Sequence, residues 1–220
     1  MKSRIRIIID IFMIVTMPLL MAYSLIGEKF HETVGTGIFL LFIIHHILNR
    51  KWYRALFKGK YNARRIIQTV LNMLLFIFMI LQPVSGILMS KHLYTFLPSL
   101  PVSSFARSTH MLLAYWGYVL MSVHAGTHMI APLRKLHGKN IKIYVAVSVL
   151  WCFISVYGFI AFIRRGFPGY MSFKTAFAFF DYSERKIYFL MDYIAIMLLF
   201  MEVGYLIIYG LGKTDIKRKR

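Results

Sequence analysis

The chain has 220 residues, of which 59% are hydrophobic and 16% charged, and its mean hydropathy is +0.63. Soluble domains are about 45–50% apolar and about 25% charged. This composition excludes a soluble globular protein, and we expect no attached soluble catalytic domain. The formal net charge of +19 does not indicate nucleic-acid binding, because the basic residues lie in short blocks between apolar runs, as topology signals do.

Six apolar runs follow one another along the chain. They lie at about 7–26, 31–48, 66–90, 109–131, 143–163 and 187–210. Each is long enough to cross a bilayer as a helix, which takes about 20 apolar residues, and charged or Pro/Gly-containing stretches separate them. The sequence therefore predicts an all-α fold, a single membrane domain over 1–220 that forms a polytopic bundle of six transmembrane helices. Pro83, in Leu81-Gln-Pro-Val-Ser85, predicts a kink in the third run.

The basic residues divide unevenly between the two sides of such a bundle. Nineteen of the 27 lie in the N-terminus (three), in 50–65 (seven), in 134–142 (four) and after Gly212 (five), segments that share one side when six helices cross. The positive-inside rule places that side in the cytoplasm, so we expect both termini there. The first run is longer than a typical signal-peptide apolar region and lacks a small-x-small cleavage site, so we expect a retained span.

The longest outer connection, 164–186, is rich in aromatic residues, which suit a segment at the level of the lipid headgroups. We favour an interfacial segment that anchors the fold; docking of a partner or a quinone is the alternative. The aromatic residues are Phe167, Tyr170, Phe173, Phe177, Phe179, Phe180 and Tyr182.

Histidines recur at one spacing in two of the runs. His31 and His45 are 14 residues apart in the second run, and His110 and His124 are 14 residues apart in the fourth. Fourteen helical residues return to within about 40° of the starting direction and rise about 21 Å. Each helix therefore carries two histidines on one face, near opposite membrane surfaces. Because the two helices run in the same direction, His31 lies at the depth of His110. His45 likewise lies at the depth of His124.

Two neutral imidazoles at one depth in a helical bundle are what a b-type haem needs. The single cysteine, Cys152, provides no C-x-x-C-H motif for covalent attachment. The pattern therefore predicts two noncovalent haem b groups. Iron would be held by His31 and His110 near the outer surface, and by His45 and His124 near the inner one. The alternative is that the histidines only hydrogen-bond neighbouring helices.

Three further residues bear on the haem interpretation. His128 is the main alternative to His124 as inner ligand, because it lies one turn later on nearly the same face; we favour His124 for its depth. Gly35 and Gly117 lie one and two turns from histidines, where a missing side chain lets a flat macrocycle approach the backbone. Such small residues also serve helix packing.

Asp10, Asp192 and Glu202 lie within the apolar runs, where ionisable groups are costly and are functional candidates by default. Asp10 and Asp192 lie near run ends, where basic neighbours or water can satisfy a carboxylate, so we expect structural roles for them. Glu202 lies deeper. A proton relay for quinol chemistry and a structural partner for a histidine are both open for it.

Several short motifs together resemble one known family. They are His31-Glu-x-x-Gly35, His45 followed by Asn49-Arg-Lys-Trp52, Arg107-Ser-Thr-His110, Tyr115-Trp-Gly117 followed by His124, and Tyr157-Gly-Phe-Ile-Ala-Phe-Ile-Arg-Arg165. From about residue 5 to 210 the chain resembles the flavinylation-associated cytochromes, ferric-reductase-like bacterial membrane proteins formerly described as a domain of unknown function. The resemblance implies a cytochrome b of the bacterial cytoplasmic membrane that passes electrons outward, often to extracytoplasmic flavoproteins. It also implies that the four histidines of the repeated spacing are the iron ligands.

We therefore expect a dihaem electron-transfer subunit of an oxidoreductase. Electrons would pass from quinol or a partner dehydrogenase to an extracytoplasmic flavoprotein or ferric acceptor. Gly35-Thr-Gly37 lies inside an apolar run and follows no strand, so we expect no flavin or nicotinamide on this chain. A histidine-based metal or proton transporter and a haemless scaffold subunit are the alternatives. Transporters often carry broken helices and inverted repeats, which the sequence does not display.

Overall fold

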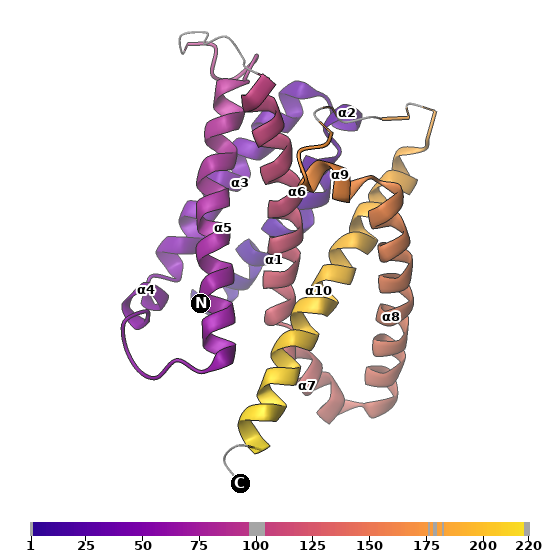
Figure 1. Cartoon of the computed structure of the whole chain (residues 1–220). Coiled ribbons are helices and arrows are strands. Elements are labelled where there is room, and N and C mark those ends of the chain that lie inside the picture. Colours follow the sequence, from indigo (N-terminus) through magenta and orange to yellow (C-terminus); the bar gives the residue numbers. More distant parts are fainter. Residues whose placement is uncertain (1, 97–103, 176, 178–179, 182, 218–220) are drawn as a thin grey trace. The chain divides into compact units, whose positions relative to one another are not determined.

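A computed structural model describes residues 2–96, 104–175, 177, 180–181 and 183–217 (Figure 1). These residues form ten helices and no strand, so the predicted all-α class is confirmed for the described part of the chain. Four helices are long and apolar enough to cross a bilayer, namely Glu28–Leu48, Ala63–Leu88, Ile141–Arg164 and Lys186–Gly212. By the length and composition of its helices, the chain is a multi-pass membrane protein.

Each of the six apolar runs contains one long helix. The helices in chain order are α1 (Lys2–Met21), α2 (Tyr23–Ile26), α3 (Glu28–Leu48), α4 (Lys51–Ala55), α5 (Ala63–Leu88), α6 (Ser104–Thr127), α7 (Ile130–Lys139), α8 (Ile141–Arg164), α9 (Phe167–Met171) and α10 (Lys186–Lys217). Helix α5 continues through Pro83.

The first run is broken near its end. Helix α1 ends at Met21, and Gly27, with a φ of 85°, separates α2 from α3. Glycine adopts this left-handed conformation at no steric cost, so the chain can turn sharply before α3. Helix α1 has 20 residues, but it carries Arg4, Arg6 and Asp10, and it is not among the four apolar helices.

The fourth run ends earlier than expected. Helix α6 has 24 residues and ends at Thr127, and a turn over His128 and Met129 leads into α7. The prediction of one run over 109–131 was therefore wrong at its C-terminal end. His128 directly follows the last residue of α6, in the turn that leads into α7.

The described residues form two compact units. The first contains α1 to α4, the C-terminal half of α5, the N-terminal half of α6, and α9. The second contains the N-terminal half of α5, the C-terminal half of α6, α7, α8 and most of α10.

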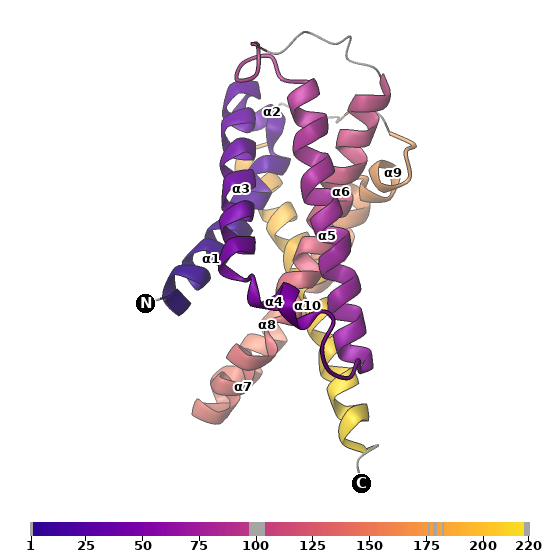
Figure 2. The same cartoon turned by 90° about the vertical axis from the view of Figure 1, so that its left-hand side faces the viewer.

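In the first unit α1 packs against α3 (Figure 2). The Arg6 guanidinium donates to the Leu48 carbonyl at 2.7 Å, which joins the start of α1 to the end of α3. Helix α9 packs on α6, because Tyr170 stacks on Tyr115 with ring centroids 4.2 Å apart. Phe167 meets the same tyrosine edge-on at 4.7 Å.

In the second unit glycines bring helices to backbone contact. A Cβ atom on Gly126 of α6 would lie 1.9 Å from the Met201 carbonyl oxygen of α10, and one on Gly204 would lie 2.1 Å from that of Val123. Helix α8 approaches α10 in the same way at Gly158. Only residues without a side chain permit such contacts, so α10 is packed closely against both α6 and α8.

Candidate functional site: the His31 and His110 pair

Helices α3 and α6 bring His31 and His110 side by side in the first unit. Their ring centroids lie 6.3 Å apart, and the ring planes are inclined by 67°. Two imidazoles bound to opposite sides of one metal ion, with metal–nitrogen bonds of about 2.0 Å, have centroids about 6 Å apart. The separation therefore fits two axial ligands of one iron.

Helix α5 orients the His110 ring through residues on both sides of Pro83. The Ser85 hydroxyl donates to the Gln82 carbonyl at 2.8 Å, so its lone pair is free to accept from His110 Nδ1 at 3.0 Å. The ring proton then lies on Nδ1 and the lone pair on Nε2, to which the Gln82 amide nitrogen lies at 3.2 Å. Metal-binding histidines use the same arrangement, in which one nitrogen donates to a neighbour and the other binds. Iron ligation by His110 would replace the Gln82 contact.

Polar atoms around this pair are incompletely satisfied. His31 Nδ1 and Gln82 Oε1 are buried and have no hydrogen-bond partner among the described residues. In native structures more than about 90% of buried backbone polar groups, and the large majority of buried side-chain polar atoms, are hydrogen-bonded, so such an atom calls for an explanation. A ring nitrogen that makes no hydrogen bond inside the protein retains its capacity to bind a metal.

Glycines near the pair behave differently from one another. A Cβ atom on Gly86 would lie 3.3 Å from His110 Cε1, so this glycine makes room for the imidazole. A Cβ atom on Gly35 would meet only Leu20 Cδ2, at 3.9 Å, and one on Gly117 would meet nothing within 4 Å. Gly117 therefore faces open space and Gly35 faces one ordinary van der Waals contact, and the role of both glycines beside a macrocycle stays a prediction.

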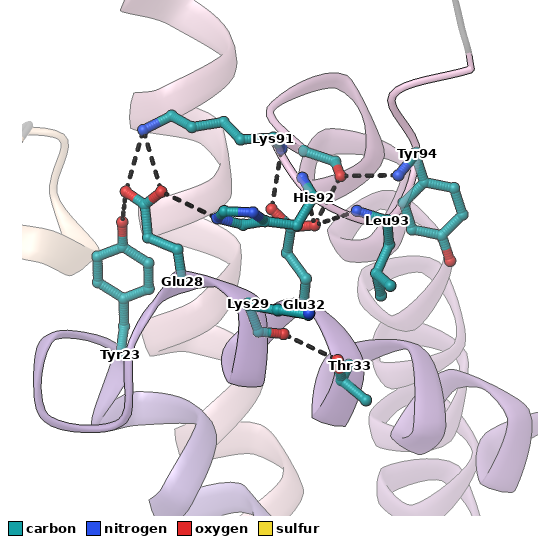
Figure 3. Close-up of polar contacts among 10 residues, drawn as sticks. Tyr23, Glu28, Lys29, Glu32, Thr33, Lys91, His92, Leu93 and Tyr94 are labelled. Carbon is teal, nitrogen blue, oxygen red and sulfur yellow. Dashed lines mark hydrogen bonds and ion pairs between the residues drawn. The ribbon is translucent and has the colours of Figure 1, made fainter.

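Glu32, the residue after His31, fastens the start of α3 to the segment that follows α5 (Figure 3). Its carboxylate accepts one hydrogen bond from a serine hydroxyl and three from consecutive backbone amides. The donors are Ser90 Oγ at 2.7 Å and the amides of Lys91 at 2.9 Å, His92 at 3.2 Å and Leu93 at 2.9 Å. This contact fixes the ends of the two helices that supply His31 and the partners of His110.

Glu28 lies one turn before Glu32 and makes a second, more exposed contact to the same segment. Its carboxylate accepts from the Tyr23 hydroxyl at 2.6 Å and from Lys91 Nζ at 3.0 Å. His92 Nε2 lies 3.5 Å away.

His45, in the last turn of α3, is oriented by a carboxylate. Its Nδ1 lies 2.7 Å from Asp10 Oδ1 of α1, and the Asn49 amide lies 3.4 Å from the same nitrogen. A neutral His45 donates its Nδ1 proton to Asp10 and keeps its lone pair on Nε2. Carboxylate–histidine pairs of this kind are common around metals. Asp10 thus has a histidine neighbour that the sequence did not predict.

His46 contacts neighbouring helices. The Tyr53 hydroxyl of α4 hydrogen-bonds His46 Nδ1, and the ring packs edge-on against Phe42 and Phe76. Burial raises the pKa of Tyr53, so the phenol keeps its proton and donates it. Nδ1 of His46 is therefore an acceptor.

His124 and His128 lie in the second unit, with ring centroids 4.9 Å apart. The Thr127 hydroxyl donates to the His124 carbonyl at 2.7 Å, at the end of α6. His45 belongs to the first unit, so its pairing with either histidine stays a prediction. Glu202 is half-buried in α10, and both of its open roles stay predictions.

Asp192 is the most buried acid among the described side chains of the second unit. Its side chain is fully buried and accepts from the Tyr157 hydroxyl at 2.5 Å, from Arg164 Nη2 at 2.6 Å and from Arg165 Nε at 2.7 Å. The expected basic neighbours are confirmed, and they support a structural role for Asp192. The Tyr157 to Arg165 motif thus joins α8 to α10.

The connection over 164–186 is partly described; residues 176, 178–179 and 182, including Phe179 and Tyr182, lie outside the described residues. Its helix α9 packs by Phe167 and Tyr170 on α6, and the Trp116 indole donates to the Met171 carbonyl at 2.9 Å. These contacts anchor the connection to the first unit. Its placement at the headgroup level stays a prediction.

Sequence reasoning missed Gln82, Ser85 and Gly86, and it assigned Asp10 no histidine partner. One signal could have found the first three: two polar residues and a glycine flank a proline inside an otherwise apolar run. Polar residues in a membrane helix need a partner on another helix, and His110 is the partner here.

Comparison with protein-family models, curated proteins and solved structures finds no match for this chain. The resemblance to flavinylation-associated cytochromes therefore stays a prediction, and the function must be argued from the geometry above. Within the described residues, no group of three or more His, Cys, Asp or Glu side chains is arranged to hold a metal ion.

Proposed function

We propose that the chain is a b-type membrane cytochrome that binds two haem groups and carries electrons across the bilayer. The observation that carries the proposal is the His31 and His110 pair, whose centroids lie 6.3 Å apart. Two histidines complete the axial coordination of a haem, which supplies one-electron chemistry when bound. The chain's own residues supply the ligands, their orientation and apolar surroundings.

Six crossings are part of the proposal. Helices α1 and α6 have 20 and 24 residues, enough to span a bilayer, although they are more polar than the other four long helices. The polarity of α1 is used within the protein, since Asp10 bonds His45 and Arg6 bonds the end of α3. Polar groups that face protein partners are tolerated inside a membrane.

The second haem would be held by His45 and His124. Asp10 orients His45 with its Nε2 lone pair free, and α6 carries His124 on the same helix as His110, about 21 Å further along the axis. His124 is favoured over His128 because its depth matches that of His45. Two haems at these depths would form a path from one membrane surface to the other.

The direction of electron transfer rests on the expected topology, and the partners are those that the family resemblance implies. With both termini in the cytoplasm, the His31 pair lies near the outer surface and faces an extracytoplasmic flavoprotein or ferric acceptor. Quinol or a partner dehydrogenase would supply electrons. Glu202 would accept or pass protons if quinol is the donor.

A haem count with reduced-minus-oxidised spectra of the purified chain tests the proposal. We expect two b-type haems in the wild-type chain. His31→Ala and His110→Ala should each remove or perturb the same haem, and the double variant should add little, because the two residues act as one unit. His137→Ala, which removes a histidine of α7 at a loop edge, is the matched control and should retain both haems.

The inner pair is tested in the same preparation. His45→Ala and His124→Ala should affect only the second haem. Loss of a haem in His128→Ala but not in His124→Ala would make His128 the ligand. If the wild-type chain is purified without haem from haem-replete cells, the cytochrome proposal is overturned. The transporter and scaffold functions then remain as the alternatives.

A further inference from the structure

A basic pocket lies in the second unit at the turn between α6 and α7. Its volume is about 410 Å³, within the roughly 300–1,000 Å³ of small-molecule sites. Helix α5 provides part of the wall, and the end of α6 with the start of α7 provides the rest. The polar lining residues are Arg64, Gln68, Thr127, His128 and Arg134.

The lining has the chemistry of an anion site. Its described residues include two guanidinium groups and no carboxylate, so none of them neutralises the positive charge of the pocket. Arginine presents a planar fork of donors that matches phosphate oxygens. Gln68 and His128 add further groups that can donate hydrogen bonds.

The start of α7 contributes to the same pocket. Ile130 and Ala131, the first two residues of this helix, line it. No side chain caps the helix at Met129, so the Ile130 and Ala131 amides are not satisfied from within their own helix. The third residue, Pro132, has no amide hydrogen. Helix N-termini favour anions, and here that preference adds to the two arginines.

We propose that this pocket binds the phosphate group of an anionic membrane lipid. The arginines belong to two basic segments, 50–65 and 134–142, that the positive-inside rule places at the cytoplasmic surface. Basic pockets between membrane helices on that side bind anionic headgroups. The proposal does not depend on haem binding.

Lipid retention by the full-length chain tests this assignment. The chain is reconstituted in nanodiscs of phosphatidylcholine alone or with about one fifth phosphatidylglycerol, and the retained anionic lipid is counted by native mass spectrometry. In the Arg64→Gln/Arg134→Gln variant, affinity for phosphatidylglycerol should fall roughly 30-fold, about fivefold for each arginine. The Lys60→Gln/Lys135→Gln variant removes the same charge from the same segments outside the pocket lining, and its affinity should stay within about twofold of wild type.

A variant with lysine at both arginine positions distinguishes loss of a local binding site from misfolding of the chain. Arg64→Lys/Arg134→Lys keeps the charge but loses the planar fork, so it should retain lipid more weakly than wild type and better than the glutamine pair. All variants should show the same elution profile and thermal midpoint. If the thermal midpoint of the Arg64→Gln/Arg134→Gln variant falls, only the Arg64→Lys/Arg134→Lys variant is used to test the site. Lipid retention equal to wild type in that lysine variant would overturn the proposal.

Three outcomes would overturn the proposal. Equal loss of lipid in the arginine-to-glutamine and lysine-to-glutamine variants would show that the lipid is attracted by surface charge in general and not by this pocket. Unchanged lipid retention in the Arg64→Gln/Arg134→Gln variant would show that the pocket does not bind the lipid. Binding of inorganic phosphate with the same arginine dependence, without binding of phosphatidylglycerol, would make a free phosphate compound the ligand.

Discussion

The helices inside each of the two units are held together by different kinds of contact. In the first, helices meet through polar side chains, as where the Glu32 carboxylate binds the segment after α5 and where Ser85 and Gln82 hold His110. In the second, Gly126 and Gly204 bring helix backbones into direct contact, and one buried polar cluster around Asp192 joins α8 to α10.

The difference teaches how each unit is specialised. Burial of apolar surface does not drive helices together inside lipid, so association depends on close packing or on polar contacts. Glycine contacts leave no space between helices, and they make the second unit dense around α10. Polar contacts in the first unit orient His110 and His45, the residues that would bind iron under the proposed function. Substitutions in the two units should therefore fail in different ways.

Removing the buried acid of the second unit should have the largest effect. Asp192→Asn keeps the size of the side chain but leaves Arg165, whose side chain is 18% exposed, without its carboxylate. Breaking a buried ion pair costs about 3–5 kcal/mol, and we expect a loss near the lower value in thermal or denaturant unfolding in detergent. Arg164→Gln is the control and should cost less than about 1 kcal/mol, because 55% of that side chain is exposed. Equal losses would contradict this ranking.

Adding one methyl group to the glycine contact should rank second. In Gly126→Ala the new Cβ would lie 1.9 Å from the Met201 carbonyl oxygen, so α6 and α10 must move apart. Overpacking costs about 1–3 kcal/mol, and the thermal midpoint in detergent should fall accordingly. Gly138→Ala, whose Cβ meets nothing within 4 Å, should be neutral or slightly stabilising, since alanine favours a helix. A stable Gly126→Ala variant would show that this contact is not tight.

Weakening the polar contact of the first unit should rank third. Glu32→Gln loses the carboxylate charge that accepts from three consecutive amides, and hydrogen bonds to a charged group contribute about 1.5 kcal/mol or more. Amide hydrogen exchange of Lys91 and Leu93 should speed up. Glu28→Gln, at an exposed ion pair, should cost about 0–1 kcal/mol. Faster exchange in the Glu28→Gln variant alone would show that Glu28, not Glu32, holds these amides.

Removing the hydroxyl that holds His110 should have the smallest effect on stability. Ser85→Ala costs about 1 kcal/mol, the contribution of one ordinary hydrogen bond. It also frees the His110 ring to rotate, so the spectrum of the outer haem should shift or broaden while the inner haem is unchanged. Ser148→Ala, which removes a hydroxyl bonded within α8, should leave both spectra unchanged. An unaltered outer spectrum in Ser85→Ala would mean that Ser85 does not position the ligand.

The sequence by itself determined the membrane class, the approximate place of six long helices and the repeated histidine spacing. These features are local: the length of an apolar run and the angle per residue depend only on residues near one another along the chain. The tertiary structure decided which side chains meet. Asp10 and His45 are 35 residues apart, and Ser85 and His110 are 25 apart. No helical period relates residues on different helices, so their contacts depend on how the helices pack.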